Sequence, residues 1–208
     1  MMQTELIFVR HGESYGNVDL PNAPVFHPDD PPLTPHGLLQ AEALASRFAP
    51  GDVDMIFAST LLRTIQTVYP TAQKLNMPIY LLPELMEQST RLHTTDPKYA
   101  KEHYPLVVFR DECGADVSDD TDQACFARAE AVLRDILSRA EGKRILIVTH
   151  GSFLGYLCRS ALGISLPETF AWQVDNCSLT RIYLRESNIP KLSVANDTRH
   201  LCIAKKGL

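Results

Sequence analysis

The sequence predicts an α/β fold: a three-layer sandwich in which helices flank a mostly parallel central sheet. Short apolar runs alternate along the 208-residue chain with segments of helical period. Two of the runs end in the same dipeptide, with His11-Gly12 after the first and His150-Gly151 after a later one. The composition, with 45% hydrophobic and 22% charged residues, is that of an ordinary globular protein.

Three strands and two helices are expected in the first part of the chain. They are a strand at 6–9, a helix from 34 to 50, a strand at 55–58, a helix continuing to 75, and a strand at 79–82. Thr34 is a good N-cap and Pro35 suits the first position of a helix. Ser59 or Thr60 is the expected cap of the second helix.

The second part of the chain begins with a segment, residues 83–120, that has no sustained period and contains several prolines. We expect an insertion there, with short helical pieces, beside the main sheet and the active site of one domain spanning residues 1–208. The remaining expected elements are a helix at 122–140, a strand at 145–148, a helix at 152–162, and strands at 179–184 and 201–204.

The net charge, the lack of long apolar runs and the cysteine pattern indicate which partners and which cellular location to expect. A net charge of −5 argues against nucleic acid as a partner, and the absence of a long apolar run argues against a membrane span. The five cysteines are scattered without a C-x-x-C pair, which favours reduced thiols and a cytoplasmic protein. No signal peptide is expected at the N-terminus. The oligomeric state is not indicated.

Polar side chains gather where the predicted strands end. In an open α/β sheet the ligand site lies outside the carboxyl ends of the strands. That edge is expected to collect one group from each of four strands, namely Arg10-His11, Arg63, Glu84 or Glu87, and His150.

These residue types suit the chemistry of a phosphoryl group. Guanidinium groups offset its negative charge and hold its oxygens bidentately. A neutral imidazole can attack phosphorus and form a phosphohistidine, and a carboxylic acid can protonate the departing alkoxide. The helix that follows Gly151 points its N-terminal N–H groups at the same place.

The segment "RHGESYGN" resembles the signature of the histidine phosphatase superfamily, the phosphoglycerate-mutase-like proteins. Further blocks match in order: "PLTPHGLLQA", "ASTLLRTIQT", "LPELME", "ILIVTHGSFL" and "DNCSLTRI". The resemblance implies the phosphoglycerate-mutase-like fold, a small phosphorylated substrate, and no metal or cofactor. It implies that His11 is the phosphorylated nucleophile, that Glu87 is the acid, and that His150 is catalytic. The implied phosphate-binding residues are Arg10, Asn17, Arg63 and Gly151.

The favoured hypothesis is a metal-independent phosphomonoesterase. Mutases of this family carry a tryptophan-rich stretch after the histidine motif, whereas here the only tryptophan is Trp172. A phosphoglycerate-type mutase and a non-catalytic phospho-ligand-binding module remain alternatives. A metallohydrolase is disfavoured because no H-x-H or H-x-x-x-H pair occurs. Glu87 is favoured over Glu84 as the acid, with Glu84 kept as the alternative, and the substrate is left open.

Overall fold

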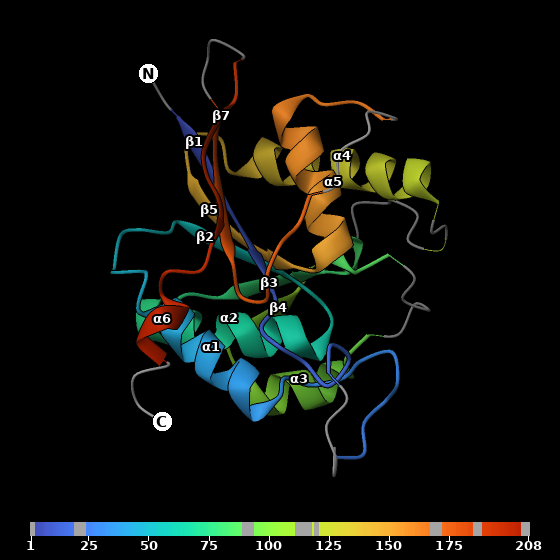
Figure 1. Ribbon diagram of the computed structural model, residues 1–208, viewed down its shortest axis with the longest axis vertical. Helices are drawn as coiled ribbons and strands as arrows, with labels where there is room; N and C mark the ends of the chain where they lie inside the picture. Colours follow the sequence, from blue (N-terminus) through green and yellow to red (C-terminus); the bar gives the residue numbers. More distant parts are fainter. Residues whose placement is uncertain are drawn as a thin grey trace.

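A computed structural model describes residues 3–18, 24–88, 94–110, 118, 121–166, 172–184 and 189–204. Its centre is a seven-stranded sheet in the order β4-β3-β2-β5-β1-β6-β7 (Figure 1). The strands are β1 (Thr4–Arg10), β2 (Met55–Ser59), β3 (Ile79–Leu82), β4 (Val107–Phe109), β5 (Arg144–Thr149), β6 (Leu179–Leu184) and β7 (Lys191–Asp197). Neighbours from β4 to β1 are parallel, and β6 runs antiparallel to both β1 and β7. The predicted fold class is confirmed.

Helices cover both faces of this sheet (Figure 1). The helical elements are α1 (Pro35–Ala45), α2 (Leu62–Leu75), the short 3₁₀ helix η1 (Pro83–Leu85), α3 (Pro97–His103), α4 (Asp122–Arg139), α5 (Gly151–Leu162) and α6 (Leu201–Ala204). Buried side chains of α1, α2 and α3 pack on one face, and those of α4 and α5 pack on the other.

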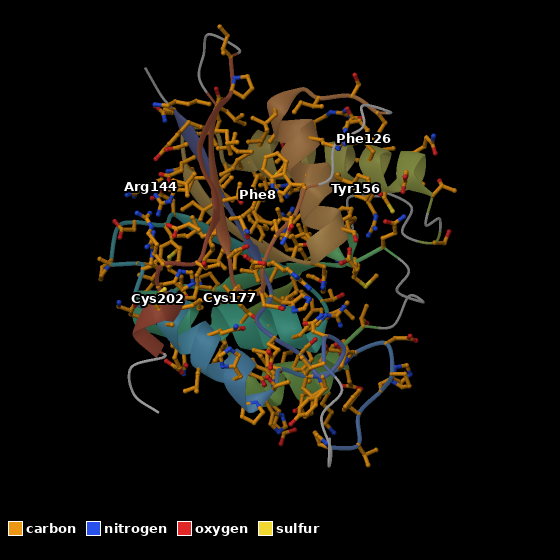
Figure 2. All side chains as sticks on the ribbon, in the orientation of Figure 1. Phe8, Phe126, Arg144, Tyr156, Cys177 and Cys202 are labelled. Atoms are coloured by element: carbon orange, nitrogen blue, oxygen red, sulfur yellow. The ribbon has the colours of Figure 1, made fainter. Side chains whose placement is uncertain are left out.

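The central strands are buried on both faces, which explains their unbroken apolar runs. In β1, Leu6 and Phe8 belong to the core under α4 and α5, whereas Ile7 and Val9 belong to the core under α1 and α2. Phe8 lies in the middle of the molecule, where side chains fill the space between sheet and helices (Figure 2). Strands packed in this way can hold their ends in fixed positions.

The ends of the first two helices differ from the prediction. Helix α1 ends at Ala45 rather than at residue 50. The N-cap of α2 is Leu61, not Ser59 or Thr60, and its side chain makes no capping bond. The carboxylate of Asp30 accepts the Leu62 N–H at 2.7 Å instead, so a loop that is distant in sequence caps this helix.

Near the C-terminus one prediction is corrected and one strand was not predicted. Residues 201–204 form the helix α6 and not a strand, because a four-residue apolar run carries no period that separates the two. The last strand is β7, and most of its residues are exposed or half-buried. As an edge strand with solvent on much of its surface, β7 lacks the apolar pattern by which strands are recognised.

The segment at 83–120 contributes more than the predicted helical pieces. Its residues 107–109 form β4, which pairs in parallel with β3 and extends the sheet. Thr95 of the same segment donates its N–H to the Thr60 carbonyl and its hydroxyl to Asp30, next to the start of α2. Among the described residues, no helix is long and apolar enough to cross a membrane.

Candidate active site

The two His-Gly pairs follow neighbouring parallel strands. Arg10 at the end of β1 is in register with Thr149 at the end of β5, and the His11 N–H donates to the Thr149 carbonyl at 2.9 Å. The imidazoles of His11 and His150 are therefore neighbours, with ring centroids 5.2 Å apart and planes inclined at 59°. The expectation that topology brings the two histidines to one edge agrees with this geometry.

The ring of His11 is held in one tautomer. Its Nδ1 lies 2.7 Å from the Gly12 carbonyl, which can only accept, so Nδ1 carries the hydrogen and Nε2 keeps a lone pair. Burial lowers the pKa of His11 well below its usual value of 6.5, and the positive charge of Arg63 lowers it further. His11 is therefore neutral at pH 7, which is the form a nucleophile requires.

The ring of His150 is held by its other nitrogen. Its Nε2 lies 2.9 Å from the hydroxyl of Ser59, at the end of β2, while its buried Nδ1 has no hydrogen-bond partner among the described residues. Burial is the main cause that lowers the pKa of His150 well below 6.5, followed by the charge of Arg63. Ser59 also accepts the Leu61 N–H, so its own hydrogen is available to His150 Nε2.

Two guanidinium groups lie beside the imidazoles. Arg10 donates to the Val174 carbonyl at 2.8 Å, and its Nε has no partner among the described residues. Arg63, in the first turn of α2, is 7% exposed and lies 3.5 Å from the Asp29 carbonyl. Burial lowers the pKa of both groups, but an arginine remains charged at neutral pH. This corner therefore attracts anions although the chain has a net charge of −5.

The glycines after the histidines make close packing possible. A Cβ on Gly12 would lie 2.9 Å from the Gly37 carbonyl of α1, so only glycine lets this helix approach the segment next to His11. A Cβ on Gly151 would lie 3.4 Å from Arg10 Nε. Gly151 thus leaves room for the Arg10 guanidinium against the start of α5.

Glu87 lies close enough to both arginines for its charge to act on Arg10 and Arg63. Its carboxylate accepts N–H groups from Ser152 at 3.2 Å and from Phe153 at 2.9 Å, at the N-terminus of α5. It also accepts the N–H of Gln88. Glu84, in contrast, is fully buried and does not line the pocket described below.

Asn17 is oriented by three donors. Its Oδ1 accepts the N–H and the hydroxyl of Ser14 and the amide N–H of Asn176, at 3.0 to 3.1 Å. The oxygen is therefore occupied and the Asn17 NH₂ group is turned the other way, where it can donate to a ligand. Asn176 also donates to the His11 carbonyl, so it connects Asn17 to the His11 backbone.

A pocket of about 270 Å³ opens over these side chains. Its lining is Arg10, His11, Ser14, Gly16, Asn17, Pro28, Asp29, Pro31, Arg63 and Glu87. His150 lies beneath, against His11, and Gly151 begins α5 behind Arg10. In the described part of the chain, no group of three or more His, Cys, Asp or Glu side chains is placed to hold a metal ion.

Sequence reasoning missed several residues of this site. Ser59 was considered only as a helix cap, and Ser14 was not singled out, because a lone serine gives no signal of a role in the site. Asn176 lies in the block "DNCSLTRI", which carried the resemblance without any chemistry being assigned to the residue. Their roles come from contacts between segments that are far apart in sequence.

Comparisons with known proteins agree with the geometry. Relatives include "Probable phosphoglycerate mutase GpmB" of Enterobacter sp. (strain 638), 31% identical over 88% of this chain and 86% of the relative. The protein of the same name from Proteus mirabilis is 27% identical over 95% and 94%.

Solved structures share the fold. A phosphoserine phosphatase from Entamoeba histolytica, in complex with 3-phosphoglyceric acid, has a TM-score of 0.67 and 24% identity, over 95% of this chain and 99% of the other. The alpha-ribazole phosphatase of Shigella flexneri has a TM-score of 0.67 and 22% identity, over 93% and 96%. The model of the histidine phosphatase superfamily (branch 1) matches residues 6–198. With both His-Gly strand ends inside that match, the chain belongs to the histidine phosphatase superfamily.

Proposed function

We propose that the protein is a phosphomonoesterase that hydrolyses small phosphorylated metabolites through a phosphohistidine on His11. The observation that carries this proposal is the hydrogen bonding of the His11 ring and its position beside two arginines. Its Nδ1 is occupied by the Gly12 carbonyl, its Nε2 keeps a lone pair, and its pocket also contains Arg10 and Arg63. A neutral nucleophile beside two fixed cations is the arrangement that attack on a phosphate dianion needs.

In the first step, His11 Nε2 forms a bond to phosphorus as the bond to the ester oxygen breaks. Arg10, Arg63 and the Asn17 NH₂ group hold the phosphoryl oxygens. His150 donates from Nδ1 to one of these oxygens, while its Nε2 accepts from Ser59. Glu87, in its acid form, gives a proton to the departing alkoxide.

In the second step, water attacks the phosphohistidine. The Glu87 carboxylate accepts a proton from that water as its oxygen bonds to phosphorus. The P–N bond then breaks, its electron pair returns to His11 Nε2, and inorganic phosphate leaves. No metal or cofactor is needed in either step, because the arginines supply the positive charge.

Two considerations support the choice of substrate and reaction. Two neighbouring structures are described as complexes with phosphoserine and 3-phosphoglyceric acid, which supports a small phosphorylated substrate. The only tryptophan, Trp172, packs against the core under α4 and α5 and is not part of the pocket lining. The tryptophan-rich stretch of the mutases therefore has no counterpart in the described pocket.

The decisive test is to trap the intermediate. The purified protein, in EDTA, should hydrolyse p-nitrophenyl phosphate and form an acid-labile, base-stable phosphoprotein that His11→Ala does not form. A panel of phosphorylated metabolites, including phosphoserine and 3-phosphoglycerate, then identifies the substrate. Complete loss of activity in EDTA with rescue by zinc or magnesium would overturn the mechanism. Binding of these compounds without turnover would indicate a non-catalytic module.

A phosphoglycerate mutase is the second candidate, and the names of the relatives favour it. A mutase returns the phosphoryl group to a sugar acid, whereas a phosphatase gives it to water. With 3-phosphoglycerate and added 2,3-bisphosphoglycerate, we expect inorganic phosphate and no 2-phosphoglycerate. Formation of 2-phosphoglycerate faster than phosphate would decide for the mutase.

A cytoplasmic location remains a prediction from the cysteine pattern.

A further inference from the structure

Arg128 is a buried cation outside the pocket. It lies on the inner face of α4 and is 3% exposed. Its Nη1 donates to two carbonyls, of Met86 at 3.0 Å and of Glu84 at 3.4 Å, and its guanidinium lies 4.2 Å from the centre of the Phe153 ring. These three contacts reach two segments of the chain. One segment carries Glu87, and the other binds the Glu87 carboxylate.

The first segment is the acid loop, residues 83–88, which carries Glu87. Arg128 holds the carbonyls of Glu84 and Met86. The carbonyl between them, that of Leu85, accepts the hydroxyl of Thr149 at 2.7 Å, at the end of β5. The loop is thus fastened by three of its backbone carbonyls, two of them through the Arg128 side chain.

The second segment is the start of α5. Its Ser152 and Phe153 N–H groups bind the Glu87 carboxylate, and the Phe153 ring packs against the Arg128 guanidinium. Arg128 therefore contacts both partners of a single hydrogen-bonded junction, the loop that bears the carboxylate and the helix end that receives it. Movement of either one relative to the other would displace Glu87.

Packing alone does not account for a guanidinium at this position. No ion pair joins Arg128 to a carboxylate of the described residues, and its Nε has no partner among them. A buried charge held in this way loses hydration, and an apolar side chain of similar length would fill the space without that loss. An apolar side chain such as methionine could not, however, donate the two hydrogen bonds to the carbonyls of the acid loop.

We propose that Arg128 is a positioning residue for Glu87, fixing the acid loop against the N-terminus of α5 so that the carboxyl group faces the leaving-group oxygen. This inference rests on the proposed function. A displacement of the Glu87 carboxyl group on the order of 1 Å can cost about 100-fold in rate. Loss of the Arg128 contacts, which we call the clamp, is therefore expected to slow the reaction although Arg128 does not contact the substrate. This loss of rate is expected only for substrates whose leaving group needs a proton from Glu87.

The test compares leaving groups. An alkoxide needs a proton as it departs, whereas a nitrophenolate leaves unaided. In Glu87→Gln, phosphoenzyme formation from an alkyl phosphate should slow by about 10²–10⁴-fold. In Arg128→Met it should slow by about 10- to 100-fold, but by less than about threefold from p-nitrophenyl phosphate, measured as the burst. The double variant should be no slower than Glu87→Gln alone, because both changes remove the same proton transfer.

Arg139→Met is the matched control, since Arg139 lies on the same helix and is exposed. It should change neither burst, and the vanadate affinity of Arg128→Met should equal that of the wild type. Equal slowing of both bursts by Arg128→Met, or losses that add in the double variant, would overturn the proposal. If Arg128→Met does not fold, Arg128→Lys, which keeps the charge but not the fork, and Phe153→Leu must show the same leaving-group pattern or the proposal is wrong.

A second measurement separates this inference from the proposed function. Amide hydrogen exchange at Ser152 and Phe153 should be at least about tenfold faster in an Arg128 variant than in Arg139→Met, because the acceptor carboxylate is no longer fixed. Unchanged exchange would overturn the clamp. A wild-type protein without any phosphoenzyme would instead refute the proposed function and leave the exchange result to decide the clamp.

Discussion

Strands β1 and β5 end in the same His-Gly dipeptide, yet the two imidazoles are held by opposite nitrogens. His11 is bonded through Nδ1 to the carbonyl of its own neighbour, Gly12, and lines the pocket through the rest of its ring. His150 is bonded through Nε2 to Ser59 of another strand and lies completely buried. In the proposed mechanism the first acts as the nucleophile, and the second donates from Nδ1.

The difference shows how little of a histidine's role is carried by its local sequence. Both rings lie beside Arg63, and burial lowers the pKa of both. They differ in the hydrogen-bond partner that each ring finds. A backbone carbonyl must accept, so it fixes the His11 hydrogen on Nδ1, whereas a serine hydroxyl can give its own hydrogen to His150.

The largest expected effect separates the two histidines directly. His11→Ala should lower turnover by more than about 10⁴-fold and prevent formation of the phosphoenzyme, because no other group can take the phosphoryl group. His150→Ala should lower turnover by about 10²–10³-fold, the usual cost of one preorganised donor, while phosphoenzyme remains trappable. Rapid-quench measurements give both values. Wild-type turnover by His11→Ala, or an exchange of the two patterns, would reverse the assignment.

The second prediction concerns Arg63, which the two histidines share. Arg63→Ala should lower kcat/KM by about 100-fold or more, or roughly 3 kcal/mol, and weaken vanadate binding. Removal of its charge should raise the pKa of both imidazoles, so the acidic limb of the pH–rate profile should move to higher pH. Vanadate titration and the pH profile measure the two effects separately. An unchanged vanadate affinity would show that Arg63 does not contact the phosphoryl group.

A smaller effect tests the partner of His150 alone. Ser59→Ala removes the hydroxyl at Nε2, and loss of one hydrogen bond should slow phosphoenzyme formation by about tenfold. Ser138→Ala, an exposed serine on α4, is the matched control and should behave as wild type. If Ser59→Ala also has the wild-type rate, the hydroxyl does not determine which nitrogen of His150 donates.

The smallest effect concerns stability. The folded-state pKa of His11 and of His150 lies below the value of the unfolded chain, near 6.5. Below that pH the unfolded state binds protons that the folded state does not, so the free energy of unfolding should fall as the pH falls. The slope should be at most about 1.4 kcal/mol per pH unit for each histidine.

Urea unfolding between about pH 7 and pH 5 measures this slope. Replacing both active-site histidines by glutamine should reduce it. His200, whose pKa is also lowered mainly by burial, contributes in the same range, so His200→Gln is the control that isolates its share. A slope that is the same in all three proteins would mean that the imidazoles are not kept neutral by burial.

The fold class and the candidate site residues could be predicted from the amino-acid pattern. Apolar runs such as residues 6–9 and 145–148 identify strands covered on both faces, and parallel strands have to present their carboxyl ends at one edge. That rule brought Arg10-His11, Arg63, His150 and one of Glu84 and Glu87 into one hypothesis, and the family resemblance then favoured Glu87. Recognition of the elements failed where the apolar pattern was weak, at the exposed edge strand β7 and the short helix α6.

How those residues are held depends on contacts between distant segments of the folded chain. The cap of α2 comes from Asp30, the partner of His150 is Ser59, and the acid loop is fastened by Arg128 from α4. Each of these polar groups bonds to a segment at least 30 residues away in the chain, as the separations of 32, 91 and 42 show. Periodicity reports which face of an element is buried, but a single buried hydrogen bond has no period, and its partner is chosen by where the folded chain places the nearest unsatisfied atom.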